Sequence, residues 1–431
     1  MPKKIEPIRS VKGTRDLLPP ETRLWQRVED ESRRVFAAYN FQEIRTPIFE
    51  STALFARSVG NDTDIVMKEM YTFEDRDRES LTLRPEATAS VVRAYIEHGM
   101  FNEGRIQKLY YMGPMFRRER PQKGRYRQFY QIGAEVLGSD HPSIDAEMLE
   151  MLTLLLERLG LKNFLLLLNS VGCPKCRPEY IKVLRQALEK VKHQMCGDCQ
   201  RRADTNPLRV LDCKVEVDQP VIDSLPHFID HLCAECRQHF ECVTGELEQR
   251  GVAYTVSPRL VRGLDYYTRT TFEITSDVLG AQNALLGGGR YDGLSEMIGG
   301  PPTPGFGVAI GEDRLVLAAQ EAAKGSSDAS RQLDVFIAWL GDESLGPASA
   351  LARDLRAKDF RVEIGYELAK LKKSLGLASK LGARFALIIG EGELASGRYQ
   401  VKDMQAGSQE EVEPARIATY LGQKLGGVSL P

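Results

Sequence analysis

The sequence has no long apolar run and no secretory signal. The stretch LKNFLLLLNS is far shorter than the roughly 20 residues that a membrane-spanning helix needs. The N-terminal segment MPKKIEPIRSVKGTRDLLPPE has no apolar core after its lysines, which a secretory signal would have. We therefore expect a cytoplasmic protein without membrane segments.

The sequence also lacks a strong charge of either sign. With 58 Lys and Arg against 60 Asp and Glu, its net charge is −2, so bulk charge indicates no nucleic-acid partner. Local basic patches can still bind phosphate on a neutral protein. The 27% of charged residues and 42% of hydrophobic residues are typical of a globular enzyme. A chain of 431 residues is too long for one ordinary core, so we expect two or three domains.

Signatures of covalent catalysis are missing as well. There is no nucleophile elbow and no serine or cysteine triad motif, and the six histidines form no catalytic pattern. GFGVAIGEDR (305–314) has one residue too many between its glycines for a dinucleotide fingerprint. GGGRYDGL (287–294) lacks the lysine and hydroxyl of a P-loop, so its glycines indicate close packing of the backbone against another group. We expect chemistry by positioning and charge stabilisation.

Periodicity divides the chain into several segments. Residues 21–39 carry apolar side chains at helical spacing, and two strand-like runs within 105–140 predict an antiparallel hairpin with a charged loop. A segment over about 171–254 holds all eight cysteines among helical stretches, and strand-rich sequence resumes after it, so we interpret it as an insertion. Small polar residues at 326–332 predict a linker. From 333 onward strands and helices alternate, which is typical of a small α/β domain with a parallel sheet.

The hairpin is the most informative segment. Its loop, FRRERPQKGRYR, carries five arginines, and a charged loop is usually just a solvated turn. The following strand argues otherwise, because alternation directs Tyr130, Ile132, Ala134 and Val136 to a core and Arg127, Phe129, Gln131, Gly133 and Glu135 to the other face. The glycine would leave room for a flat ligand, and arginine suits forked contacts with phosphate. We expect a site for a nucleotide and a small polar co-substrate.

Two further stretches allow two interpretations each. LTLRPEATAS (81–90) predicts a strand that feeds a helix. Its Pro85 and Glu86 either simply suit the first helical turn or take part in binding. RGLDYYTRTTFE (262–273) crowds directional hydrogen-bonding groups beside a glycine. It is either a tyrosine-rich strand edge or the wall of a small polar pocket. Arg314, near a helix start, could stack on a flat ring.

The cysteines occur largely in pairs. CPKC (173–176) and CGDC (196–199) form the pattern C-x2-C-x19-C-x2-C, which is close to zinc-ribbon spacing, and CAEC (233–236) adds a third pair. Small buried hydrophobes with free thiols are the alternative interpretation. We expect a structural zinc site, whose ligands would be Cys173, Cys176, Cys196 and Cys199.

Taken together, these stretches resemble the histidyl-tRNA synthetases, a family of class II aminoacyl-tRNA synthetases. FQEIRTPIFE, FRRERPQKGRYRQF and GFGVAIGEDRL are similar to the three class-defining motifs, and LVRGLDYYTRTTFE and GGGRYDGL to two histidine-specific motifs. KGTRDLLP and LGARFALIIGEGELASGRYQVKDM extend the resemblance to nearly the whole chain except the insertion. It implies an α+β catalytic domain with a mainly antiparallel sheet over 1–325, and an α/β anticodon-binding domain over 333–431.

The resemblance also implies a reaction. L-Histidine and ATP would give histidyl-adenylate and pyrophosphate, with Mg2+ on the phosphates, and the histidyl group would pass to tRNA(His). Arg117 and Arg262 would be catalytic, contacting the α-phosphate where charge builds up. Arg125 and Arg314 would complete the ATP contacts, with Arg314 stacked on adenine.

The resemblance implies a histidine pocket too. Its residues would be Glu86, Ala87, Thr88, Gln131, Glu135, Tyr266 and Tyr267. Glu86 and Thr88 would hold the amino group and Gln131 would lie near the carboxylate. Glu135 and Tyr267 would bracket the imidazole, and this pairing would reject isosteres that lack either ring partner. The family usually has glycine at position 87, so the effect of the extra methyl group is an open question.

The implied partners are tRNA and a second copy of the chain. Arg120, Gln122 and Lys123 would contact the tRNA acceptor end, Lys370, Lys372 and Lys373 the anticodon stem, and the first motif a homodimer partner. One alternative is a non-catalytic, synthetase-like regulatory subunit of ATP phosphoribosyltransferase in histidine biosynthesis. Such subunits typically lack the histidine motifs and the anticodon domain, both of which this chain has. Another is a class II synthetase for a different amino acid, against which the polar RGLDYYTRT argues.

Overall fold

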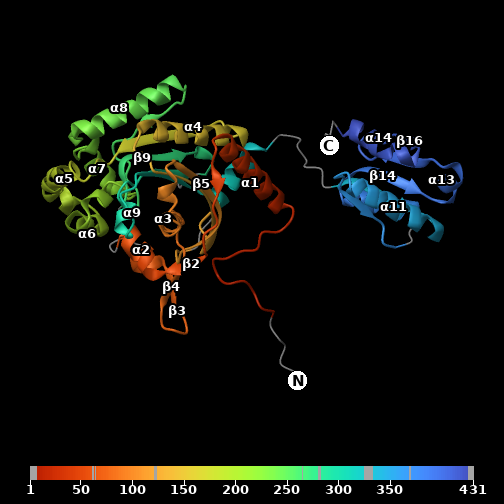
Figure 1. Cartoon of the computed structure of the whole chain (residues 1–431), viewed down its shortest axis with the longest axis horizontal. Helices are drawn as coiled ribbons and strands as arrows, with labels where there is room; N and C mark the ends of the chain where they lie inside the picture. Colours follow the sequence, from red (N-terminus) through yellow and green to blue (C-terminus); the bar gives the residue numbers. More distant parts are fainter. Residues whose placement is uncertain are drawn as a thin grey trace. The chain divides into compact units, whose positions relative to one another are not determined.

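A computed structural model describes residues 7–60, 63, 65–120, 124–264, 266–279, 283–324, 333–367 and 370–425 of the chain. The chain forms two compact units, Met1–Lys324 and Gly325–Pro431 (Figure 1). The expected linker at 326–332 lies outside the described residues. Among the helices that are described, none has the length and apolar character needed to cross a membrane.

The first unit is built on an eight-stranded sheet with the strand order β1-β5-β6-β11-β10-β9-β7-β8. These strands are β1 (Gln42–Glu43), β5 (Gln107–Phe116), β6 (Gln128–Leu137), β7 (Leu165–Ser170), β8 (Thr255–Val256), β9 (Thr268–Thr275), β10 (Ala284–Arg290) and β11 (Gly305–Gly311). The outer pairs β1–β5 and β7–β8 are parallel, and the five pairings between them are antiparallel. The expected hairpin and mainly antiparallel sheet are therefore confirmed.

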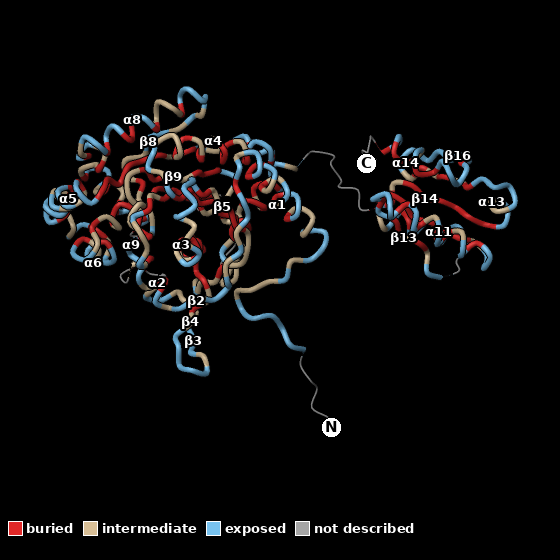
Figure 2. The backbone as a smooth tube through the Cα atoms, viewed as in Figure 1, coloured by how far each residue is buried: buried red, intermediate tan, exposed pale blue. Residues whose placement is uncertain are grey.

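One face of this sheet carries the main core. The helices that contribute to it are α1 (Glu21–Ala38), α4 (Pro142–Arg158), α8 (Ala234–Gln249) and α10 (Glu312–Ala322). From β6, Ile132, Ala134 and Val136 are buried in this core, as the alternation predicted. Figure 2 shows the buried backbone running through the middle of the unit, with the exposed segments outside it.

The opposite face of β6 looks toward a smaller polar and aromatic layer. Its helices are α2 (Thr52–Val59), α3 (Thr88–Glu97) and α9 (Leu294–Met297), and a three-stranded sheet of β2 (Phe49–Ser51), β4 (Ser80–Leu83) and β3 (Tyr71–Glu74) adjoins them. β4 leads to α3, as LTLRPEATAS predicted. A cluster that includes Ala87, Tyr111, Tyr266 and Tyr291 fills this layer, so aromatic side chains surround the polar groups described below.

The insertion leaves the sheet after β7 and has a core of its own. It contains α5 (Arg177–Val191), α6 (Gly197–Thr205) and α7 (Gln219–Asp223), connected by turns and short 3-10 segments. Its buried cluster includes five of the cysteines together with Tyr180, Leu184 and Phe228. The expected insertion also covers α8, but Phe240, Val243 and Leu247 of this helix belong to the main core. The last part of the segment thus packs with the main sheet of the first unit.

The second unit is a five-stranded sheet with helices. Its strand order is β13 (Val362–Ile364), β12 (Leu333–Trp339), β14 (Ala383–Ile389), β15 (Tyr399–Asp403) and β16 (Gln409–Val412). Its helices are α11 (Leu345–Arg356), α12 (Leu371–Lys380), α13 (Glu391–Ser396) and α14 (Ile417–Lys424). The first three strands are parallel, but β15 and β16 add an antiparallel hairpin that the expectation of a parallel sheet omitted. In β15 buried and half-buried positions alternate, which fits a strand with only one face in the core.

Candidate active site

Two adjoining cavities lie against β6, β10 and β11. The first has a volume of about 250 Å³ and the second about 210 Å³. Both are lined by Arg117, Gln131, Arg262, Gly287 and Ala309. The site is thus a pair of compartments with two arginines at their common wall, where an anionic group shared by two ligands would lie.

The two arginines are positioned by different elements. Arg117 follows β5, donates from Nε to the carbonyl oxygen of Pro85 at 2.9 Å, and has its guanidinium 5.3 Å from the ring centre of Phe129. Arg262 donates from Nη1 to Glu273 Oε2 of β9 at 2.8 Å. Each guanidinium is therefore held on one side, while both also line the cavities.

Gly287 of β10 makes room for Arg262. A Cβ atom at position 287 would lie 2.5 Å from Nη1 of Arg262 and 2.6 Å from its Cζ. Close packing of the backbone at GGGRYDGL is thereby confirmed, and the guanidinium that packs on it belongs to the other histidine-specific motif. Gly133 of β6 differs from the expectation. The space above Gly133 is taken by the ring of Tyr111, whose hydroxyl would be 2.3 Å from a Cβ there, so the idea that a ligand lies flat on Gly133 is wrong.

Glu86 and Thr88 bring the start of α3 to the second cavity, which both residues line. The backbone N–H groups of Thr88 and Ala89 donate to the two carboxylate oxygens of Glu86 at 2.7 and 3.1 Å. Glu86 is only 4% exposed, and burial raises its pKa against the opposing effect of these N–H donors. Glu86 therefore both caps the helix and lines the cavity, so its two sequence interpretations are compatible.

Glu135 is a fully buried carboxyl group behind the second cavity. Thr88 Oγ1 donates to its Oε1 at 2.7 Å, and the Tyr291 hydroxyl donates to its Oε2 at 2.5 Å. Burial raises the pKa of Glu135 to about 8, although both hydroxyl donors favour the ionised form. Glu135 does not itself line either cavity, whereas Thr88 and Tyr291 both line the second. Tyr291 is a site residue that sequence reasoning missed, because GGGRYDGL was interpreted through its glycines.

The tyrosines of RGLDYYTRTTFE form the other wall. Tyr266 and Tyr267 line the second cavity with ring centres 4.8 Å apart, and Tyr266 lies edge-on to Tyr291 at 5.8 Å. Burial raises the pKa of both Tyr266 and Tyr267, so their hydroxyl groups remain protonated donors at neutral pH. Asp265 lies outside the described residues.

Ala87 answers the question that its extra methyl group raised. The residue is fully buried in the aromatic cluster with Val91 and Tyr111, and it is not among the residues that line the second cavity. Its φ of −115° is an ordinary value for an L-residue. The methyl group therefore packs into the apolar layer and does not narrow the cavity.

The first cavity is lined by charged residues from several elements. Arg314, at the start of α10, donates from Nη1 to the carbonyl oxygen of Ala284 at 2.8 Å, and burial lowers its pKa. Arg125 donates to Glu119 at 3.2 Å, and both line the cavity. Glu119 and Glu273 were not singled out from the sequence, although both lie within the quoted motifs.

None of the described residues that were expected to contact tRNA lines either cavity. Arg120 is exposed, while Gln122 and Lys123 are outside the described residues. In the second unit, Lys370, Lys372 and Lys373 are all exposed at the start of α12.

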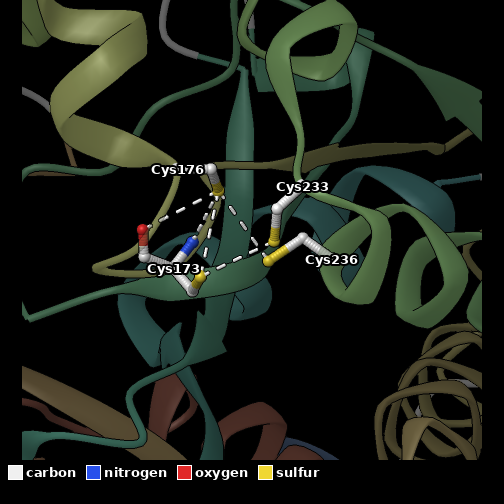
Figure 3. Close-up of side chains that lie close together, drawn as sticks. All are labelled: Cys173, Cys176, Cys233 and Cys236. Carbon is white, nitrogen blue, oxygen red and sulfur yellow. Dashed lines mark hydrogen bonds between the residues drawn. The ribbon is translucent and has the colours of Figure 1, made fainter.

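The structure groups the cysteines differently from the expected zinc set. Cys173 and Cys176 lie with Cys233 and Cys236 in a group called cluster 1 here (Figure 3). Cys196 and Cys199 lie with Cys213 and Asp218 in a second group, cluster 2. The four residues chosen from the C-x2-C-x19-C-x2-C spacing are therefore divided between two clusters, either of which could hold a metal ion. Linear spacing favoured the nearer pair, but the fold brings the more distant CAEC beside CPKC.

Comparison with known proteins agrees, over both units, with the family resemblance of the sequence motifs. Residues 13–315 match the family model of histidyl-tRNA synthetase, and residues 334–424 match that of an anticodon binding domain. The chain is 58% identical over 415 residues to a histidine–tRNA ligase of Solibacter usitatus, covering 96% of this chain and 99% of that protein. A histidine–tRNA ligase of Koribacter versatilis is 57% identical over 438 residues, covering 98% and 99%.

A solved structure extends the similarity to the fold. The apo histidyl-tRNA synthetase of S. aureus matches with a TM-score of 0.80 at 40% identity, covering 96% of this chain and 99% of that one. Sequence and structure thus agree over nearly the whole length, and the chain belongs to the histidyl-tRNA synthetase family.

Proposed function

We propose that this protein joins L-histidine to tRNA(His) in two steps, through a histidyl-adenylate made from histidine and ATP. The observation that carries the proposal is the pair of cavities that share Arg117 and Arg262. A reaction between a carboxylate and a nucleotide phosphate needs two compartments that meet at a cationic wall. The histidine–tRNA ligases named above support this assignment over the regulatory-subunit alternative, because they match over nearly their full lengths.

ATP would occupy the first cavity and histidine the second. An oxygen of the histidine carboxylate attacks the α-phosphorus, and the bond from that phosphorus to the pyrophosphate oxygen breaks. Negative charge grows on the α-phosphate during this displacement, and fixed guanidinium groups stabilise it without reorganisation of solvent. Arg117 and Arg262 are placed for this role, since both line the common wall. Arg314 and Arg125, which line the first cavity but not the second, would contact the nucleotide.

Mg2+ would accompany the phosphates of ATP. Glu119 and Glu273 line the first cavity and offer carboxylate oxygens, which are the ligands that Mg2+ prefers in proteins. The ion would neutralise the charge of the departing pyrophosphate. Arg125 and Arg262 form ion pairs with these two carboxylates at 3.2 and 2.8 Å. The groups that would bind phosphate are therefore directly paired with those that would bind the metal.

Histidine recognition is assigned to the second cavity. Glu86 and Thr88 would hold the amino group, and Gln131, which lines both cavities, would lie near the carboxylate. Tyr267 would face one side of the imidazole. Glu135 would act on the other side as the buried acid behind Thr88 and Tyr291, to which both hydroxyl groups donate. Tyr266 would close the wall.

The partners and location follow from the same activity. Arg120 would contact the acceptor end of tRNA, and the lysines at the start of α12 would contact its anticodon stem. Exposed apolar side chains of the first motif, Ile48 at 44% and Phe49 at 52% exposure, support a homodimer interface. A cytoplasmic location is proposed because the tRNA substrate is used there.

Amino-acid-dependent exchange between ATP and labelled pyrophosphate tests the function. We expect exchange with histidine and background exchange with the other amino acids. Preference for another amino acid would contradict the substrate assignment. No exchange with any amino acid, by a folded protein, would instead favour the non-catalytic regulatory subunit.

A further inference from the structure

Two clusters in the insertion are not used by the proposed reaction. In cluster 1 (Cys173, Cys176, Cys233, Cys236) and in cluster 2 (Cys196, Cys199, Cys213, Asp218), the ligand atoms of each group all lie within 4.8 Å of one another. We propose that each cluster holds one structural Zn2+, and that the zinc of cluster 1 fixes the loop that supports the histidine pocket.

The spacing of the sulfur atoms in cluster 1 suits a tetrahedral metal. The Sγ atoms of Cys173 and Cys176, of Cys173 and Cys233, and of Cys176 and Cys236 are each 3.9 Å apart. A tetrahedron with Zn–S bonds of about 2.3 Å has edges of about 3.8 Å. A disulfide would need about 2.05 Å. Figure 3 shows the four sulfur atoms facing one another across a common centre. Cys173 and Cys176 precede α5, whereas Cys233 and Cys236 lie at the start of α8.

Further contacts stabilise the two C-x2-C segments of cluster 1 in the arrangement that a zinc site needs. The backbone N–H of Cys173 donates to Cys176 Sγ at 3.3 Å, which stabilises a thiolate. Lys175 of the first segment forms an ion pair with Glu235 of the second at 2.9 Å. Cys176 and Cys236 are 6% and 1% exposed, so a cation at the centre would be shielded from water. Simple apolar packing would not require two C-x2-C loops to converge from opposite ends of the insertion.

Cluster 2 contains a buried carboxylate, which is an independent sign of a cation. Asp218 is fully buried, and it accepts the backbone N–H of Cys196 at 2.8 Å and the thiol of Cys213 at 3.1 Å. Cys196 Sγ and Cys213 Sγ are 4.0 Å apart. A buried carboxylate is unfavourable unless its charge is offset, and Zn2+ accepts both Cys thiolates and Asp carboxylate oxygens as ligands. Zn2+ at this centre would offset the charge of Asp218 and of the thiolates together.

Cluster 1 is connected directly to the proposed histidine pocket. The loop that precedes Cys173 pairs with the start of β9, where Val171 N–H donates to the Arg269 carbonyl at 2.8 Å and Arg269 N–H donates to the Gly172 carbonyl at 2.7 Å. Arg177, which follows Cys176, donates from Nη2 to the carbonyl oxygen of Tyr267. Since Tyr267 lines the second cavity, zinc in cluster 1 would hold the backbone of one pocket wall. This part of the inference rests on the proposed function of that cavity.

The metal content of the purified full-length chain tests the two sites. Inductively coupled plasma mass spectrometry should find two zinc ions per chain after dialysis. Cys236→Ser and Cys199→Ser should each retain one, and the double variant none. Cys242→Ser is the matched control, because this exposed cysteine belongs to neither cluster, and it should retain two. A wild-type protein with no zinc, or with another metal in its place, would overturn both sites. If the wild-type protein holds only one zinc ion, the cluster whose serine variant keeps that ion would be overturned.

Cobalt substitution keeps the test decisive if a variant fails to fold. The wild-type chain grown with Co2+ should show the visible bands of tetrahedral cobalt and intense sulfur-to-cobalt charge-transfer absorption. Octahedral spectra without charge-transfer absorption would show that the metal is not bound by the cysteines, and would overturn the proposal.

The link to the pocket has a separate readout. Cys236→Ser should raise the KM for histidine at least fivefold in pyrophosphate exchange, with the KM for ATP changed less than twofold. Cys199→Ser should leave the KM for histidine within twofold. If Cys236→Ser lacks its zinc but keeps the wild-type KM for histidine, the link fails while the zinc sites stand. Failure of the proposed function would appear as absent exchange in the wild type, which leaves the metal measurement unaffected.

Discussion

The proposed histidine pocket and the cysteine-rich insertion hold buried polar groups in different ways. In the pocket, Glu135 is fully buried and is paired with two hydroxyl groups that the surrounding strands and helix deliver to it. In the insertion, cluster 2 buries Asp218 among cysteines. Glu135 is thus paired with hydroxyl groups of the protein, whereas we infer that Asp218 and the cysteines around it also bind an ion.

The difference follows from the elements available in each region. The pocket is bounded by neighbouring strands, whose register fixes which side chains meet. Glu135 and Gly307 are partners on β6 and β11, and only a glycine fits beside that carboxylate, since a Cβ at position 307 would be 1.7 Å from its Oε2. The insertion has short helices, and helices of nine and five residues such as α6 and α7 are marginal on their own. A small helical core of this kind is usually reinforced by a cross-link.

The largest effect should come from removing the cation at the common wall. Arg262→Ala should reduce histidine-dependent pyrophosphate exchange by about 1,000-fold, because a fixed charge at the reacting phosphate is lost. Circular dichroism should remain that of the wild type. Arg105→Ala is the matched control, since this arginine has a side chain that is 60% exposed and pairs only with surface Glu103 in the described chain. Exchange within a few-fold of wild type for Arg262→Ala would remove this residue from the mechanism.

Glycine at 287 should be the next most sensitive position. Gly287→Ala should lower exchange by about 10- to 100-fold, because its Cβ would displace the Arg262 guanidinium by way of contacts near 2.5 Å. Gly293→Ala provides a control in the same motif, since a Cβ there meets no atom within 4 Å. Equal activity of the two variants would show that the position of Arg262 tolerates displacement, and the pocket would then be less strictly fixed by its sheet than we infer.

Chelation should separate the two regions most directly. After zinc removal, limited proteolysis should cut between residues 192 and 218 about ten times faster, since cluster 2 lies in this stretch. Hydrogen exchange in β6 and β10 should stay slow, because these strands pair on both sides. If chelation loosened the strands as much as the insertion, the two regions would form one cooperative unit and the contrast between them would be lost.

The acidity of Glu135 predicts a pH-dependent stability. Its pKa rises from 4.5 to about 8 in the folded chain, so the folded state retains a proton that the unfolded state releases. The contribution of this group to stability is therefore present below pH 4.5 and is lost as the pH rises toward 8. Glu135→Gln does not titrate at this position. The melting temperature of the variant minus that of the wild type should therefore increase by several degrees between pH 5 and pH 8. A constant difference across that range would show that the carboxyl group is ionised throughout.

The smallest effect is expected at position 87. Ala87→Gly restores the residue usual in the family, but it removes a fully buried methyl group from the aromatic cluster. We expect a loss of stability of about 1 kcal/mol in chemical denaturation and a KM for histidine within threefold of wild type. A tenfold fall in that KM would mean that the methyl group does narrow the pocket.

Local patterns were sufficient for the two faces of β6, whereas most of the proposed pocket residues came from the family resemblance. Alternation along β6 correctly separated Ile132 and Ala134 from Gln131 and Glu135, because the two faces of one strand differ in polarity. The site of Tyr291 could not be obtained in this way. Its contact with Glu135 joins residues that are distant in sequence, and its own segment shows only a glycine pattern.

The wrong predictions concern positions whose surroundings are determined by residues distant in sequence. Gly133 looked like a ligand floor, but it is paired with Tyr111 on β5, and the identity of a cross-strand partner is not visible in one strand. The cysteine grouping failed for the same reason, since spacing along the chain does not show which loops converge. In the second unit, β16 is a short and mostly exposed strand, QEEV, without the apolar pattern that predicts one.

Cluster 1 also has a consequence for the connectivity of the chain. Its ligands come from the first and the later part of the insertion, and Cys173 Sγ lies 3.9 Å from Cys233 Sγ. The segment between Cys176 and Cys233 is therefore a loop closed at its base. Because the ends of such a loop are already fixed, its length can change at small entropic cost. The segment between the two C-x2-C loops is thus the part of the catalytic unit best suited to being shortened, exchanged or extended while β7 and β9 keep their pairing.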